Sequence, residues 1–181
     1  VYWGTGNPGP DYNGEVREGD NLYADSVLAL DGDTGDMSWY FQFTPHDVHD
    51  WDAIQIPVLA DIEIDGTPRK TMLWANRNAF YYTLDRETGE FLVGKAFARQ
   101  TWAEGLDENG RPIRRPNMFP SAEGTLVSPT AGGATNWWSP AFSPRTGLLY
   151  VNAFDGEAEF FIRDEEYRAG DRYTGGGTDS P

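Results

Sequence analysis

The chain contains no cysteine, so no disulfide, thiol nucleophile or zinc–cysteine site can form within its 181 residues. It also lacks long apolar runs: no stretch of 18 apolar residues occurs, so no segment is expected to span a membrane. Basic residues are few, 14 Lys and Arg against 29 Asp and Glu, which gives a formal net charge of −15. Such a surface repels phosphate backbones and anionic lipids, so nucleic acid is not an expected partner.

Aromatic residues and turn-forming residues are abundant. Aromatics make up 14% of the chain, including seven tryptophans, which indicates a packed core, and the 21 glycines and 12 prolines indicate many turns. No segment keeps a 3.6-residue apolar period, so short strands are expected rather than long helices. The chain starts with "VYWGTGN", without an initiator methionine or a signal peptide, and we expect this start to lie inside a strand of a longer protein.

A hairpin pattern occurs three times. Each copy has a β-favouring segment, a polar turn that ends in Thr-Gly, and a second β-favouring segment. The copies are ALDGDTGDMSW (29–39), TLDRETGEFLV (83–93) and AFSPRTGLLYV (141–151). Glycine at the turn predicts a positive φ. The copies begin at residues 29, 83 and 141, and a hairpin repeated at such a spacing predicts an all-β propeller of mostly antiparallel four-stranded blades.

Residue composition also predicts where the individual strands and the longest loop lie. We expect strands at 26–31, 37–43, 70–76, 79–85 and 147–154. The segment 101–135 is rich in Gly, Pro and polar residues and is predicted to be a long inter-blade loop with some short strand.

The stretch TPHDVHDWDA (44–53) holds both histidines and three aspartates. If the chain is extended here, Asp50 and Asp52 point to one face and Trp51 to the other. Two carboxylates on one face repel each other unless a cation lies between them. A zinc site is disfavoured because no third histidine or cysteine completes its shell, so His46 and His49 are expected to fix the loop through hydrogen bonds.

Four collinear segments resemble the pyrroloquinoline quinone (PQQ)-dependent quinoprotein alcohol dehydrogenases. They are YWGTGNPGPDYNGEVREGDNLY (2–23), TPHDVHDWDA (44–53), LWANRNAFYYTLDRETG (73–89) and GGATNWWSPAFSPRTGLLYV (132–151). The three hairpins also resemble the tryptophan-docking repeats of that family, although only the first keeps its tryptophan, Trp39, where the others carry Val93 and Val151. The resemblance implies that residues 1–181 are about three blades of an eight-bladed β-propeller.

The resemblance also implies roles for individual residues. Asn7, Asp50 and Asp52 would be metal ligands, Asp50 and Arg77 catalytic residues, and Arg77, Asn136 and Trp137 cofactor contacts. From the residues alone each has an ordinary alternative: an Asn-Pro turn at Asn7, surface aspartates, an exposed hairpin arginine, and plain blade packing for the tryptophans.

The implied cofactors are PQQ and one metal ion. In the family an aspartate at the position of Asp52 marks lanthanide-dependent members, so a lanthanide is favoured and calcium is the alternative. The implied reaction is hydride transfer from a small primary alcohol to metal-bound PQQ, with electrons passing to a cytochrome c. By the same resemblance the protein would be periplasmic. The sequence is also compatible with a homo-oligomer, which it does not decide.

Two other functions fit parts of the sequence. One is a non-catalytic β-propeller scaffold or binding module, because many propellers share a repeat without a site. The other is a calcium-stabilised sugar-binding propeller, which would explain the acidic and aromatic residues but not Arg77.

The family's glutamate ligand, adjacent-cysteine disulfide and stacking tryptophan have no counterpart in this chain, so the isolated chain is expected to be inactive.

Overall fold

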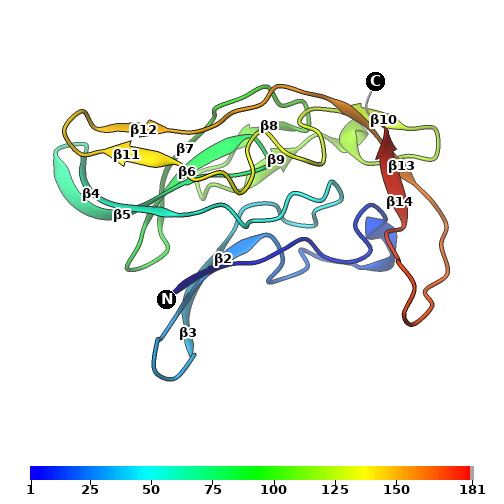
Figure 1. Ribbon diagram of the computed structural model, residues 1–181, viewed down its shortest axis with the longest axis horizontal. Helices are drawn as coiled ribbons and strands as arrows, with labels where there is room; N and C mark the ends of the chain where they lie inside the picture. Colours follow the sequence, from blue (N-terminus) through cyan, green and yellow to red (C-terminus); the bar gives the residue numbers. More distant parts are fainter. Residues whose placement is uncertain (180–181) are drawn as a thin grey trace.

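The computed structural model describes residues 1–179 as a set of antiparallel β-sheets (Figure 1). The strands are β1 (Tyr2–Gly4), β2 (Ser26–Leu30), β3 (Met37–Gln42), β4 (Val58–Ile64), β5 (Thr67–Ala75), β6 (Phe80–Asp85), β7 (Phe91–Ala96), β8 (Ala103–Leu106), β9 (Pro112–Arg114), β10 (Thr125–Val127), β11 (Ala141–Ser143), β12 (Leu148–Tyr150), β13 (Ala158–Ile162) and β14 (Gly176–Asp179). Two 3₁₀ turns, η1 (Gly14–Val16) and η2 (Pro116–Met118), are the helical elements of this part of the chain. Neither has the length or hydrophobicity that crossing a bilayer requires.

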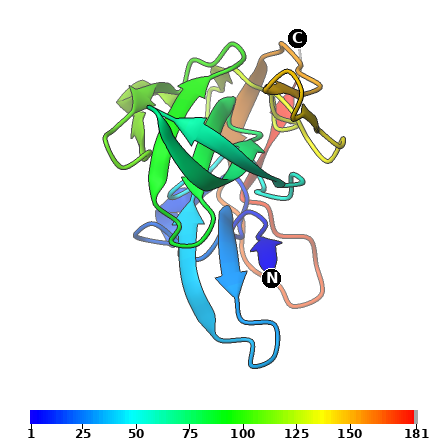
Figure 2. The same ribbon diagram turned by 90° about the vertical axis from the view of Figure 1, so that its left-hand side faces the viewer.

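Neighbouring strands of a sheet are consecutive in the chain, except that β10 pairs with β13. The complete four-stranded unit is β4-β5-β6-β7, and β1-β2-β3 and β10-β13-β14 form three-stranded sheets. Two further hairpins are β8-β9 and β11-β12. Figure 2 shows the four-stranded sheet strongly twisted, with the β2–β3 hairpin projecting away from it.

The three predicted hairpin turns are confirmed. Gly35, Gly89 and Gly147 have φ values of +78°, +79° and +68°, which residues with a Cβ adopt only with strain. In the first two turns an aspartate, Asp31 or Asp85, accepts hydrogen bonds from the turn amides through its side chain. The strand predicted over 147–154 is shorter than expected, since β12 ends at Tyr150.

Trp39 joins two successive repeats. A Cβ built on Gly89, the turn glycine of the second repeat, would lie 2.7 Å from a ring carbon of Trp39. The indole therefore lies flat against the backbone of the next unit, and it also contacts Tyr2, with 5.7 Å between ring centroids. This is the blade-to-blade packing that the docking repeat predicts.

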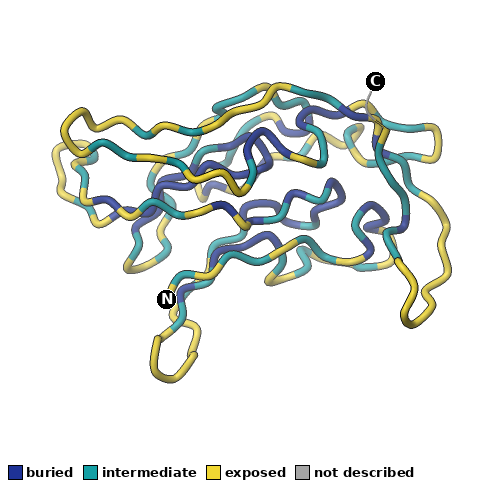
Figure 3. The backbone as a smooth tube through the Cα atoms, viewed as in Figure 1, coloured by how far each residue is buried: buried dark blue, intermediate teal, exposed yellow. Residues whose placement is uncertain are grey.

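An aromatic core lies between the sheets and continues into the 44–53 segment. Figure 3 marks the buried backbone of this region in dark blue. Phe43 stacks on Trp74 at 4.8 Å, and Trp51 contacts Trp102 at 5.0 Å. The last five residues of β5, from Thr71 to Ala75, are all buried, so both faces of this central strand are covered. The core thus holds the loop at 44–53 against rigid strands.

Candidate functional site

The loop between β3 and β4 is held in place by the carboxylate of Asp47. This buried side chain accepts hydrogen bonds from the backbone amides of His49 (3.0 Å) and Trp51 (2.7 Å). The indole of Trp51 donates to the carbonyl of Thr130 (2.9 Å), and the amide of Ala53 donates to the carbonyl of Thr5 (3.0 Å). The loop is therefore tied to two distant segments, and its aspartates have fixed positions.

The two histidines bind backbone rather than each other. The imidazole of His49 stacks on Trp51 at 4.3 Å, and its Nε2 lies 3.0 Å from the carbonyl oxygen of Met118. Burial, helped by the charge of Arg114, lowers the pKa of His49 well below its usual range, so it is neutral. The Nδ1 of His46 lies 2.7 Å from the carbonyl oxygen of Gly19. Both contacts match the loop-fixing role expected for these residues.

Asp50 has an unusual backbone and an unusual environment. Its φ is +62°, so this loop is not the extended segment that the sequence suggested, and that part of the interpretation is wrong. Burial raises the pKa of Asp50 to about 7; Arg77 opposes the rise, whereas the carboxylates of Asp52, Asp47 and Asp11 add to it. A carboxyl group that titrates near neutral pH is suited to accept a proton.

Asp52 links the loop to the start of the chain. Its Oδ1 accepts a hydrogen bond from the backbone amide of Asn7 (2.8 Å), and its Oδ2 lies 2.6 Å from Nη1 of Arg77. A Cβ added at Gly6 would lie only 2.9 Å from that Oδ1, so glycine permits the close approach. The side-chain amide of Asn7 donates to the carbonyl of Pro8 (3.4 Å). Burial raises the pKa of Asp11, a residue that the sequence did not single out, and the nearby side chain of Asn7 opposes that rise.

Arg77 occupies the tight turn between β5 and β6 and is buried. Its second terminal nitrogen donates to the carbonyl of Ala131 and lies 3.9 Å from the carboxylate of Asp50. Its own carbonyl accepts from the amide of Ala134 (2.9 Å), and its Nε is buried without a partner. The arginine is thus clamped between the aspartate loop and the 131–134 segment.

Asn136 and Trp137 follow that clamping segment but are less enclosed. Asn136 donates to the carbonyl of Gly132 (2.9 Å), and its side-chain oxygen accepts from the amide of Trp137. The indole of Trp137 is 63% exposed and stacks on Trp138 at 5.1 Å. The structure therefore brings Asn7, Asp50, Asp52 and Arg77 together, while Asn136 and Trp137 lie at the open end of the adjoining loop.

This cluster suits an anionic cofactor beside a hard cation. Two carboxylates and one amide supply oxygen donors of the kind that calcium and similar ions prefer, and such ions take six to eight ligands, so this chain would provide part of a shell. Within residues 1–179 no group of three or more His, Asp or Glu side chains is arranged to hold a metal. The raised pKa of Asp50 and the unpartnered Nε of Arg77 fit a place where further charged or polar groups bind.

Comparison with known proteins identifies the family of this chain. Residues 1–96 match the PQQ family described as glucose/ethanol/alcohol dehydrogenase, beta-propeller domain, which covers just over half of the chain. This chain belongs to that family. Among the relatives of this PQQ family protein is the quinohemoprotein alcohol dehydrogenase ADH IIB of Pseudomonas putida, 44% identical over 83% of the chain. Another is the quinoprotein alcohol dehydrogenase PedH of Pseudomonas putida, 38% identical over 98% of the chain.

Solved structures of the PQQ family superpose closely. A europium-containing methanol dehydrogenase aligns with a TM-score of 0.91 and 33% identity over 98% of the chain. The quinohemoprotein alcohol dehydrogenase of Comamonas testosteroni aligns with a TM-score of 0.92 and 35% identity over 98% of the chain. The chain spans only 22% and 31% of the two Pseudomonas relatives, so it corresponds to a part of the β-propeller of such proteins.

Proposed function

We propose that this chain forms part of the active site of a PQQ-dependent alcohol dehydrogenase that oxidises a small primary alcohol. The observation that carries the proposal is the placement of one buried guanidinium, that of Arg77, against the carboxylates of both Asp50 and Asp52. A scaffold propeller gains nothing from crowding two carboxylates around an arginine whose Nε stays unpartnered.

Asp50 is proposed as the base. It lies beside Asp52 and Arg77, and its pKa near 7 lets it hold or release a proton at neutral pH. In this role its carboxylate accepts the hydroxyl proton of the alcohol. Bound PQQ would supply the two-electron acceptor for the hydride that leaves the alcohol carbon, which becomes the carbonyl carbon of an aldehyde.

Arg77 is proposed to bind and orient the cofactor. Its guanidinium is fixed by Asp52 and by the carbonyl of Ala131, so its direction is set before any ligand arrives. A fixed cation stabilises negative charge that develops beside it. Asn136 and Trp137 are proposed as further residues that would contact the cofactor, since Asn136 is half-buried and Trp137 presents an exposed indole.

Asn7, Asp50 and Asp52 are proposed as the metal ligands of this chain. A metal there would act as a Lewis acid toward the cofactor. The second carboxylate, Asp52, favours a trivalent lanthanide over calcium because it adds one more negative oxygen donor. The europium-containing relative supports this preference.

The electron acceptor and the compartment are proposed on the family alone. A cytochrome c would take the electrons, and the protein would be periplasmic. One relative is named 1-butanol dehydrogenase (cytochrome c), from Thauera butanivorans, which supports the proposed acceptor.

Metal binding tests the proposal directly. We expect the chain to bind Eu³⁺, measured by europium luminescence, and Asp50→Asn and Asp52→Ala to weaken binding at least tenfold. Asp33→Asn is the control, because Asp33 is an exposed aspartate of the first hairpin turn outside the cluster. If Asp33→Asn weakens binding as much as the cluster variants, the ion binds to the acidic surface and the site is refuted.

Activity is the second test. In a longer protein that contains this chain, PQQ and a lanthanide are expected to support dye-linked ethanol oxidation, and Asp50→Asn is expected to abolish it. The 181-residue chain given the same additions is expected to be inactive. Turnover by the Asp50→Asn protein at the wild-type rate would remove Asp50 from the reaction.

A further inference from the structure

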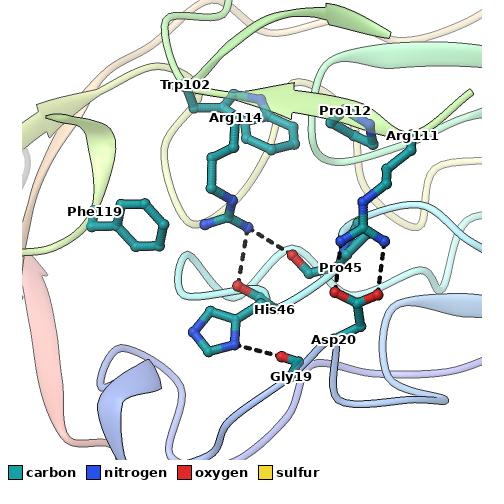
Figure 4. Close-up of a pocket in the computed structure, with 9 residues that line it drawn as sticks. All are labelled: Gly19, Asp20, Pro45, His46, Trp102, Arg111, Pro112, Arg114 and Phe119. Atoms are coloured by element: carbon teal, nitrogen blue, oxygen red, sulfur yellow. Dashed lines mark hydrogen bonds and ion pairs between the residues drawn. The ribbon is translucent and has the colours of Figure 1, made fainter. Parts of the chain in front are cut away.

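A cleft lies beside the start of the 44–53 loop (Figure 4). It has a volume of about 500 Å³ and is formed by three parts of the chain: the 19–20 loop, the start of the 44–53 loop, and the 102–119 segment with β9. None of Asn7, Asp50, Asp52 and Arg77 lines it. It is therefore a separate feature from the proposed active site.

Arg114 is the central group of this cleft. Its guanidinium carbon lies 5.4 Å from the ring centre of Trp102 and 4.9 Å from that of Phe119, so two aromatic rings flank the cation. Nη2 donates to the carbonyls of Pro45 (2.9 Å) and His46 (3.0 Å). In Figure 4 the other terminal nitrogen points away from these carbonyls, toward the side on which Phe119 lies.

That other nitrogen, Nη1, is buried and has no hydrogen-bond partner. A buried N–H group of a charged side chain costs free energy when it is left unpaired, so it marks a place where an acceptor is missing. Burial lowers the pKa of Arg114 to about 10, while Asp47 opposes this, and the guanidinium stays positive at neutral pH.

The other charged groups of the cleft are already paired. Arg111 makes two hydrogen bonds to the carboxylate of Asp20, at 2.6 and 2.8 Å, so these side chains neutralise each other. No carboxylate within the described residues forms an ion pair with Arg114. Arg114 is thus the one charged group lining this cleft that makes no direct ion pair within the described residues, although the buried carboxylate of Asp47 favours its charged form.

We propose that this cleft binds a small aromatic carboxylate, with one carboxylate oxygen accepting from Nη1 of Arg114 and the ring lying beside Phe119. The carboxylate oxygen supplies the acceptor that Nη1 lacks, in a charge-assisted hydrogen bond. The apolar walls favour a flat organic anion over phosphate, which needs more donors than one free arginine edge provides.

Benzoate is the probe for this site. We expect isothermal titration of the full chain with benzoate to give a Kd on the order of 1 mM, as for a small ligand held by one charged contact. Benzamide, the neutral analogue of the same shape, and inorganic phosphate are each expected to bind at least tenfold more weakly. Equal binding of benzamide would overturn the carboxylate assignment, and tighter binding of phosphate would overturn the aromatic one.

Variants locate the site. Arg114→Gln is expected to weaken benzoate binding at least tenfold, and Arg115→Gln, which removes the same charge from an exposed neighbour, is expected to leave it unchanged. Because Arg114 also holds two backbone carbonyls, its variant could lose the fold of this region. Phe119→Ala, at a side chain that is 39% exposed, is the second variant and is expected to weaken binding several-fold at an unchanged melting temperature.

Two outcomes would refute the site. One is benzoate binding that Arg115→Gln reduces as much as Arg114→Gln does. The other is wild-type protein that shows no benzoate binding at concentrations well above 1 mM.

Discussion

The Nη1 atom of Arg77 lies 2.6 Å from Oδ2 of Asp52, across 25 residues of sequence. The other terminal nitrogen of Arg77 lies 3.9 Å from Asp50, so one guanidinium serves two carboxylates. The side chain of Arg77 is 8% exposed, and those of Asp52 and Asp50 are 23% and 29% exposed. The arginine is therefore the cation that keeps these two aspartates together in this structure.

Removing the charge of Arg77 is expected to destabilise the fold. Arg77→Met should lower the free energy of unfolding by about 3 kcal/mol, because it leaves Asp50 and Asp52 facing each other without a cation. Arg69→Met is the control: the Arg69 side chain, which pairs with Asp85 and Glu90, is 36% exposed against 8% for Arg77, and the loss should stay below about 1 kcal/mol. Urea unfolding measures both, and similar losses for the two variants would show that Arg77 makes no special contribution.

The charge of Asp52 is expected to set the metal preference. Asp52→Ala should shift the ratio of lanthanide to calcium affinity toward calcium by at least tenfold, because it removes one negative oxygen donor. Competition between La³⁺ and Ca²⁺ in a calorimetric titration measures the ratio. A lanthanide preference that survives this substitution undiminished would show that Asp52 does not choose the metal.

The contact between Trp39 and Gly89 gives a matched pair of variants. Gly35 and Gly89 have nearly equal φ values, +78° and +79°, but an added Cβ meets nothing at Gly35 and meets Trp39 at Gly89. Gly35→Ala should cost about 1 kcal/mol for its backbone conformation alone. Gly89→Ala should cost about 1–3 kcal/mol more, because the indole must move. Equal losses in urea unfolding would mean that the packing of Trp39 on this turn does not stabilise the repeats.

Asp25 is expected to make stability depend on pH. Both of its carboxylate oxygens are buried without partners, and burial, with the nearby charges of Asp47 and Asp52, raises its pKa well above 3.8; Arg17 and Arg77 oppose the rise. The folded state therefore keeps a proton that the unfolded state loses above pH 3.8. This contribution to stability is fully present below that pH and is lost as pH rises toward the folded pKa.

Asp25→Asn removes this titration. The variant should be more stable than the wild type at pH 8, on the order of 1–3 kcal/mol, because no buried charge has to be accommodated. The two proteins should have similar stability near pH 3.5. Thermal unfolding at both pH values measures the difference, with Asp33→Asn, at an exposed aspartate, as the control. A difference that does not change with pH would contradict the buried charge as its cause.

Local features were predictable where neighbouring residues decide the conformation. The Thr-Gly turns were predicted because a tight turn requires a residue that tolerates positive φ, and Gly35, Gly89 and Gly147 supply it. The strands around the first two turns were predicted because β-favouring residues flank a short polar turn. The packing of Trp39 against the next repeat was implied by the resemblance to the tryptophan-docking repeats.

Other features could not be predicted, because they depend on which segments meet. The left-handed backbone of Asp50 has no signal in TPHDVHDWDA, and it replaced the expected extended conformation. Asp11, Asp25 and Asp47 were not distinguished from the other acidic residues, since an acidic chain offers many aspartates of the same local type. Their burial and their pKa shifts arise only from neighbours far away in sequence.

The sequence by itself determined that this chain is an all-β repeat protein with turns at defined glycines, and the four resembling segments indicated its family. Tertiary structure alone decided that Arg77 is shared between Asp50 and Asp52, and that one nitrogen of Arg114 has no acceptor. The reason is physical: a turn is stabilised by a few adjacent residues, whereas burial and charge pairing are set by the packing of the whole chain.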